Sequence, residues 1–179
     1  MSRSCATLWK ASRCRCERVI STQYPVFRRM NFLRFLMMLA LAIWLGGIIF
    51  FSAGAAPAVL HTISDRALGG AIISESLTRL HWMGVVCGAI FLAASVAYSR
   101  MARGEFQIFS ASKLLVALMI GLTLISQLAI MPRMAALRAA SSAAAYADFT
   151  QLHQWSVSLE AAILVFGVIV LYFEVRRNW

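Results

Sequence analysis

The sequence predicts an all-α integral membrane protein, a four-helix bundle with an interfacial amphipathic helix between its first and second membrane spans. Of its 179 residues, 61% are hydrophobic and 13% are charged, whereas soluble domains have about 45–50% apolar and about 25% charged residues. The mean hydropathy is +0.75. The apolar residues form continuous runs and do not alternate, which favours helices over a β-barrel. The composition therefore excludes a water-soluble globular enzyme.

Four runs are long enough to cross the hydrocarbon core, which takes about 20 apolar residues in a helix. They cover residues 32–56, 80–98, 114–131 and 155–173 within one domain at 30–177. The first run also resembles a signal peptide, because basic residues precede it and small residues end it. Its apolar core at 35–51 is longer than the usual 7–15 residues of such peptides, so we favour a retained anchor.

Residues 1–29 carry seven of the 17 lysines and arginines but only one acid, Glu17. They show no hydrophobic period, and we interpret them as a basic disordered tail or as the product of a start assigned upstream of Met30. A targeting peptide is a weaker alternative because the apolar residues are scattered. An excess of basic residues beside the first apolar run is what orients a membrane helix. No basic helix with side chains that could contact nucleic-acid bases follows it. We therefore expect no nucleic-acid partner.

The two longer connections also carry helical patterns. Residues 63–80 place apolar side chains near one face, which suits a short helix in the membrane interface. Residues 133–146 are rich in alanine and are expected to extend the third helix beyond a bend at Pro132. Asp148, with Gln151 three residues later, fits the N-cap of the fourth helix.

Lysine and arginine counts orient the spans. Thirteen such residues fall on the side of the two termini, against four on the opposite side, or six against four without the tail. Because cytoplasmic loops carry this excess, we expect a multi-pass protein with both termini in the cytoplasm. In a bacterium, the membrane would be the cytoplasmic membrane.

Polar residues gather near the outer ends of the predicted spans. The three histidines, His61, His81 and His153, all fall at this level. On the fourth helix, His153, Ser156 and Glu160 are spaced i, i+3, i+7 and form one stripe. Gln127 lies about one turn inward on the third helix. These residues predict a polar cluster between the helices.

This cluster has three interpretations. His81 and His153, together with His61 or a methionine, are candidate ligands for haem b or copper. Alternatively, His153 and Glu160 line a path for a proton or cation, since an ionisable residue inside a span is by default a functional candidate. The third interpretation is structural, because imidazoles suit the interface and Glu160 lies only about 8 Å from Trp155 along the helix. No catalytic motif is present, so we name no catalytic residue and expect a non-enzymatic protein without a cofactor.

Small residues mark expected close approaches between helices. Gly46, Gly47, Gly84 and Gly88 are the clearest, because glycine lets membrane helices pack backbone to backbone. Such faces also suit contact with a second copy of the chain or with a partner membrane protein. The lipid bilayer is the other expected partner.

Four segments carry a resemblance to a known family. They are residues 39–60, 80–88, 131–138 and 149–167, with Trp44, Pro57, the Leu80-His81 pair, Pro132-Arg133 and Arg138, and Phe149 with Leu152, His153 and Ser156. Their order and spacing resemble the transmembrane-protein-205-like domain, a four-helix membrane domain. Glu160 departs from the uncharged residue expected there. The resemblance implies export or tolerance of a small solute or drug, or a role in membrane organisation. Weaker similarity to copper-resistance membrane domains and to haem-binding membrane oxidases motivates the alternative of a haem or copper protein.

Overall fold

The computed structural model describes residues 28–103, 110–140 and 143–176, and within these ranges all regular structure is helical. Four helices are long and apolar enough to cross a membrane: Arg28–Thr62, Ala67–Ala102, Ala111–Ala140 and Ala145–Arg176. At about 1.5 Å per residue, even a 30-residue helix reaches about 45 Å and exceeds the hydrocarbon thickness of about 30 Å. The prediction of an all-α bundle with four apolar spans is confirmed.

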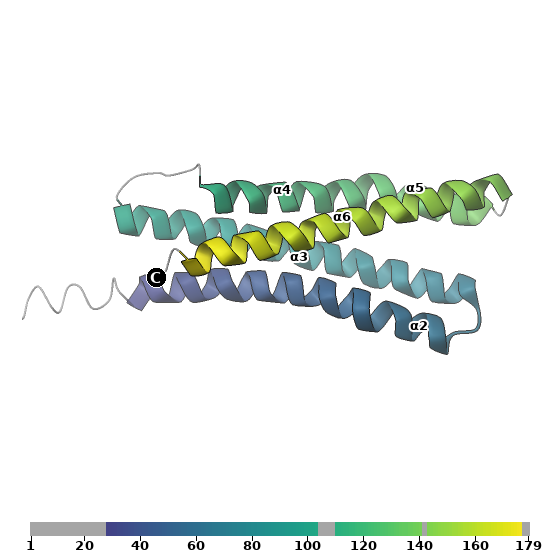
Figure 1. The fold of residues 1–179 in the computed structure, drawn as a ribbon, viewed down its shortest axis with the longest axis horizontal. Coiled ribbons are helices and arrows are strands. Elements are labelled where there is room, and N and C mark those ends of the chain that lie inside the picture. Colours follow the sequence, from purple (N-terminus) through teal and green to yellow (C-terminus); the bar gives the residue numbers. More distant parts are fainter. Residues whose placement is uncertain (1–27, 104–109, 141–142, 177–179) are drawn as a thin grey trace, which may run out of the picture.

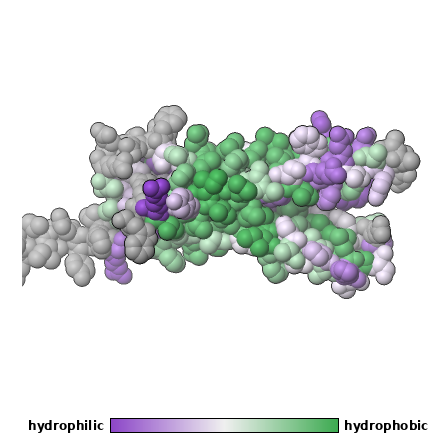
Figure 2. Space-filling view, viewed as in Figure 1, coloured by the Kyte–Doolittle hydropathy of each residue, from purple (hydrophilic) through white to green (hydrophobic). Residues whose placement is uncertain are grey.

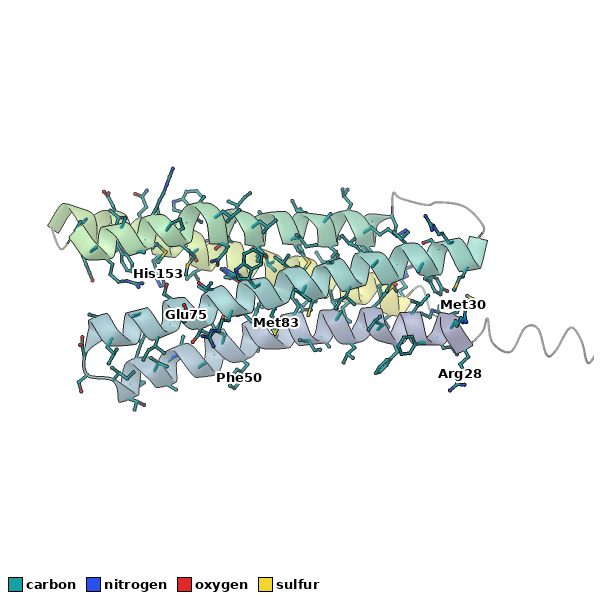
Figure 3. All side chains as sticks on the ribbon, turned by 180° about the vertical axis from the view of Figure 1, so that it is seen from behind. Arg28, Met30, Phe50, Glu75, Met83 and His153 are labelled. Atoms are coloured by element: carbon teal, nitrogen blue, oxygen red, sulfur yellow. The ribbon has the colours of Figure 1, made fainter. Side chains whose placement is uncertain are left out.

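The helices run up and down as antiparallel neighbours (Figure 1). The first span is a helix at residues 28–50 that continues as η1 (Phe51–Ala55) and α2 (Ala56–Thr62), and the second is α3 (Arg66–Arg103). The third consists of α4 (Ala111–Ile125), η2 (Ser126–Ile130) and α5 (Met131–Ala140), and the fourth is α6 (Ala143–Arg176). We call the end with Thr62 and Ala140 the cavity end and the end with Arg28 and Arg176 the terminal end. Figure 3 places Arg28 and Met30 at the terminal end and Glu75 and His153 toward the cavity end.

The interior of the bundle is built from inward-facing residues at spacings of three and four, as the helical period requires. On α3 these are His81, Gly84, Gly88, Phe91 and Ser95, and on α6 they are Ser156, Glu160, Ile163, Gly167 and Val170. Trp44 from the first span fills the centre and is only 2% exposed. Polar and charged positions thus share the same buried stripes with apolar ones.

The outer surface of the bundle is apolar around its middle and hydrophilic toward its ends (Figure 2). Large apolar side chains such as Phe50, Leu118, Leu128 and Val165 are each more than 45% exposed there. In water such a surface would be strongly unfavourable, since apolar area costs about 25 cal/mol per Å². The belt is therefore the surface that contacts lipid.

Two wide helical turns interrupt the α-helical hydrogen bonding, and each precedes a proline. The N–H of Ala56 bonds to the carbonyl of Phe51 just before Pro57, and the N–H of Met131 bonds to that of Ser126 just before Pro132. Proline lacks an N–H and its ring clashes with the carbonyl four residues earlier, so a widened turn relieves the strain. The third helix continues through Pro132 to Ala140, as expected, but residues 143–146, which were also expected to extend it, belong to α6.

Two further sequence expectations are wrong. No separate interfacial helix lies between the first and second spans, because residues 66–79 form the first turns of the continuous helix α3. The amphipathic pattern there reflects a helix end that emerges from the membrane. Asp148 is also not an N-cap, since α6 already begins at Ala143. The predicted tail at 1–29 lies almost wholly outside the described residues, and only Arg28 and Arg29 belong to the first helix.

Candidate functional site

Three polar side chains from three different helices meet inside the bundle. His81 of α3 is 3% exposed, and its Nδ1 lies 2.9 Å from Oε1 of Gln127 in η2. Its Nε2 lies 2.5 Å from Oε1 of Glu160 in α6, a short hydrogen bond. We call Gln127, His81 and Glu160 the polar triad.

The hydrogen bonds determine where the protons of the polar triad lie. The amide oxygen of Gln127 only accepts, so Nδ1 of His81 must carry a proton and donate it. The contact between Nε2 and the Glu160 carboxyl then needs one further proton, held either by the imidazole or by the carboxyl group. In both forms the His81–Glu160 pair has zero net charge. A neutral pair is the favourable state here, because an uncompensated charge in a low-dielectric interior is costly.

Local structure explains why these three residues meet. His81 and Glu160 occupy positions on the inward stripes of α3 and α6, continuous with the core residues that follow each of them. Gln127 belongs to the widened turn before Pro132, which shifts the helical register at this point. The proline-induced turn thereby contributes to placing an amide next to His81.

A cavity of about 1250 Å³ opens beside the polar triad and is lined by residues from all four spans. Its wall is mostly apolar, with Ile48, Phe51, Leu77, Met131 and Leu164 among the lining residues. Figure 2 shows the hollow between the two halves of the molecule at the cavity end. Glu160 lines this cavity, its carboxyl group contacts His81, and its side chain is 14% exposed.

Aromatic and cationic side chains also line the cavity. Arg138 of α5 donates from Nη1 to the carbonyl of Gly70 on α3 at 3.2 Å, and its guanidinium lies 5.1 Å from the ring centroid of Phe149. The Phe149 ring stacks on His153 with centroids 6.2 Å apart. These contacts connect α3, α5 and α6 across the cavity. The four residues involved all line it: Gly70, Arg138, Phe149 and His153.

The predicted polar residues thus divide into two groups. His153, Ser156 and Glu160 all line the cavity, as does His61 in the last turn of α2. His61 and His153 are exposed, and no hydrogen bond links either of them to His81 among the described residues. The structure therefore joins His81 to Glu160 and Gln127, and places the other two histidines elsewhere on the same cavity.

The donor set does not fit haem or copper in this arrangement. Both ring nitrogens of His81 are engaged, one with Gln127 and one with Glu160. Within the described ranges, no three His, Cys, Asp or Glu side chains gather closely enough to hold a metal ion. To bind a metal, His81 would have to break its hydrogen bond to Gln127 or to Glu160, which costs free energy. The haem or copper hypothesis stays a prediction.

The four predicted packing glycines differ in their surroundings. A Cβ atom on Gly47 would lie 2.8 Å from Leu80 and Met83, and one on Gly88 would lie 2.7 Å from Ile120. A Cβ on Gly84 would clash with the indole of Trp44. At Gly46, by contrast, a Cβ would meet no atom within 4 Å, so this glycine does not mark a close approach.

Sequence reasoning missed the partner of His81 and a second buried polar group. The spacing along the fourth span grouped Glu160 with His153. The signal that could have paired Glu160 with His81 is the periodic stripe of inward-facing residues on α3 and on α6. At the terminal end, Lys113 donates from Nζ to Ser99 Oγ at 3.0 Å, and both are buried. Glu174 is 4% exposed at the same end, and its Oε1 has no hydrogen-bond partner within the described ranges.

Comparison with known proteins gives one match. The model of a family described as "Domain of unknown function (DUF4149)" matches residues 39–143, which is more than half of the chain. No curated protein matches, and no solved structure matches. The matched region includes His81 and Gln127 but ends before Glu160.

Proposed function

We propose that this chain, which belongs to the DUF4149 family, binds an apolar or amphipathic small molecule in its intramembrane cavity and transports it. The observation that carries the proposal is the cavity of about 1250 Å³ between all four apolar spans. Ligand sites are typically hollows of about 300–1,000 Å³ with apolar walls and a few convergent polar groups. This cavity is somewhat larger than that range, and it has an apolar wall with the polar triad at one side.

The residues that resemble the transmembrane-protein-205-like domain support the same site. Pro57, Arg138, Phe149, His153 and Ser156 all belong to that resemblance, and all five line the cavity. A resemblance concentrated on a cavity wall, and not only on helix packing, favours a role for the cavity itself. Export or tolerance of a small solute is the activity that the resemblance implies.

The direction of transport follows from the expected topology. The counts of lysine and arginine favour termini in the cytoplasm, so the cavity end would face outward. A solute that enters from lipid or from the cytoplasmic leaflet would then leave through the cavity past Arg138 and Phe149.

A cavity-filling substitution tests the proposal. Ala161 lines the cavity next to Glu160, so Ala161→Phe should fill part of it and weaken binding of a neutral apolar fluorophore about tenfold or more, since overpacking a site excludes its ligand. Binding is measured by fluorescence with purified protein in lipid nanodiscs, with empty nanodiscs as the blank.

Val165→Phe is the matched control. Val165 lies on the same helix, is 56% exposed and does not line the cavity. This variant should bind the fluorophore as the unsubstituted protein does. Equal binding by all three proteins, or none above the empty nanodisc, would overturn the proposed cavity function.

A further inference from the structure

We propose that the ligand is a lipophilic organic cation and that it exchanges for the single proton shared by His81 and Glu160. This inference rests on the proposed function and adds the charge of the ligand and its coupling to protons. Its basis is the position of Glu160, whose carboxyl group contacts His81 Nε2 and also lines the cavity.

The charge balance of the pair requires a one-for-one exchange. With its shared proton, the His81–Glu160 pair is neutral and offers no net attraction to a cation. When that proton leaves to water, Nδ1 of His81 still donates to Gln127, and the carboxylate of Glu160 retains one negative charge. A monovalent cation next to Glu160 brings the summed charge of the pair and its ligand back to zero, which a low-dielectric environment favours. Binding of one cation therefore releases one proton.

The other charged and titratable groups around the site leave this balance in place. His61 of α2, Arg138 of α5, and Tyr146 and His153 of α6 also line the cavity. Arg138 is engaged with Gly70 and Phe149 and keeps its charge throughout the physiological range. Cys87 of α3 is buried about 9 Å further along the helix from His81. Among the residues that line the cavity, Glu160 is the one carboxylic acid.

The lining selects an organic cation over a bare metal ion. A metal ion needs several oxygen, nitrogen or sulfur ligands at short range, and within the described parts of the chain no group of three acidic, histidine or cysteine side chains gathers to supply them. The wall instead offers apolar side chains and the aromatic rings of Phe51 and Tyr146. Such rings attract delocalised cations through their π faces.

Two nearly isosteric compounds test the inference. Methyltriphenylphosphonium is a lipophilic cation, and triphenylphosphine oxide is a neutral compound of almost the same shape. Their binding to the purified protein in nanodiscs is measured by calorimetry in two buffers of different ionisation enthalpy, which gives the number of protons released. The cation should bind at least tenfold more tightly than the oxide, release about one proton, and bind more weakly at low pH, where the pair keeps its proton.

Variants locate the effect. Glu160→Gln should abolish proton release and the preference for the cation while retaining binding of the neutral oxide, which also shows that the variant is folded. Glu160→Asp should keep both properties in part. Glu75→Gln is the matched control, because Glu75 is an exposed acid on α3, paired with Arg79 and absent from the cavity lining. It should behave like the unsubstituted protein.

The outcomes separate this inference from the proposed function. If the oxide and the cation bind equally, or if the cation binds without releasing a proton, the cavity function stands and the cation exchange is wrong. The same conclusion follows if Glu75→Gln abolishes the preference as Glu160→Gln does. If neither compound binds the unsubstituted protein, the proposed function itself fails.

Discussion

At the scale of single residues, the first span packs closely on α3 where Trp44 meets the glycines of α3. Trp44 is almost fully buried, and a Cβ atom on Gly84 would lie 2.7 Å from its Cε2 and 2.9 Å from its Cδ1. Those distances are far shorter than the optimal separation of about 3.5–4.0 Å between carbon atoms. Glycine at this position is therefore what lets the first span and α3 approach so closely.

This packing predicts that Gly84→Ala destabilises the bundle by about 1–3 kcal/mol, because a buried indole has to shift to admit the methyl group. Gly46→Ala is the matched control, since its methyl group would meet no atom within 4 Å. Alanine there should be neutral or stabilising by up to about 1 kcal/mol through its higher helix propensity. Thermal unfolding in detergent, followed by circular dichroism, measures both. Equal stabilities of the two variants would refute this account of Gly84.

The sequence alone identified the site's residue types but not their pairing. His81, Gln127 and Glu160 were all predicted as members of one polar cluster near the same depth. Their pairing depends on the rotation of three helices about their axes, which the spacing within one helix cannot supply. The distinction between Gly46 and Gly84 has the same origin, because only the neighbouring helix decides whether a Cβ atom has room.

At the scale of elements, α3 is one continuous helix from Arg66 to Arg103. Its first turns carry polar residues on one face, and this pattern resembles that of a helix lying in the membrane interface. An amphipathic stretch at the end of a long span gives the same periodicity, because its inner face packs on a neighbouring helix and its outer face meets water. The sequence periodicity therefore predicted that this stretch is helical, but not that it continues along the axis of the second span.

A distance measurement distinguishes the two arrangements. Spin labels at Leu68 and Met101, both exposed, should lie about 50 Å apart if the 33 intervening steps form one straight helix. An interfacial helix lying perpendicular to the span at 80–98 would reduce the distance to about 37 Å by the same rise per residue. The measurement uses double electron–electron resonance in a background where all four cysteines are replaced. A distance near the smaller value would contradict the continuous helix.

Pro132 shows the opposite case, in which the sequence predicted the element well, whereas the first span was predicted to end before Pro57 and continues to Thr62. Pro132 was expected to bend the third span without ending it, and the helix does continue to Ala140. What the sequence did not reveal is the widened turn before each proline. That turn is one of several solutions to the missing N–H, and the surrounding packing selects among them.

At the scale of the whole molecule, the bundle combines an apolar outer belt with a cavity that has a polar side. The belt requires lipid around it, whereas the His81–Glu160 pair requires the lipid to be kept out. Both requirements are met because the polar side chains lie on the inward stripes of α3 and α6, and the exposed positions of the same helices are apolar. The four-span architecture was predictable from composition and length, but the cavity was not, since it depends on how the spans diverge toward one end.

The central claim is that the cavity beside Glu160 is open to solutes while the outer face of α6 lies in lipid. Thiol labelling tests it most directly, with Ala161→Cys in the cavity and Val165→Cys on the outer face, each in the cysteine-free background and in sealed vesicles. A small cationic methanethiosulfonate should label Ala161→Cys, and prior addition of methyltriphenylphosphonium should protect it. Val165→Cys should remain unlabelled because thiols do not ionise to the reactive thiolate in hydrocarbon. Rapid labelling of Val165→Cys together with an unreactive Ala161→Cys would contradict the account.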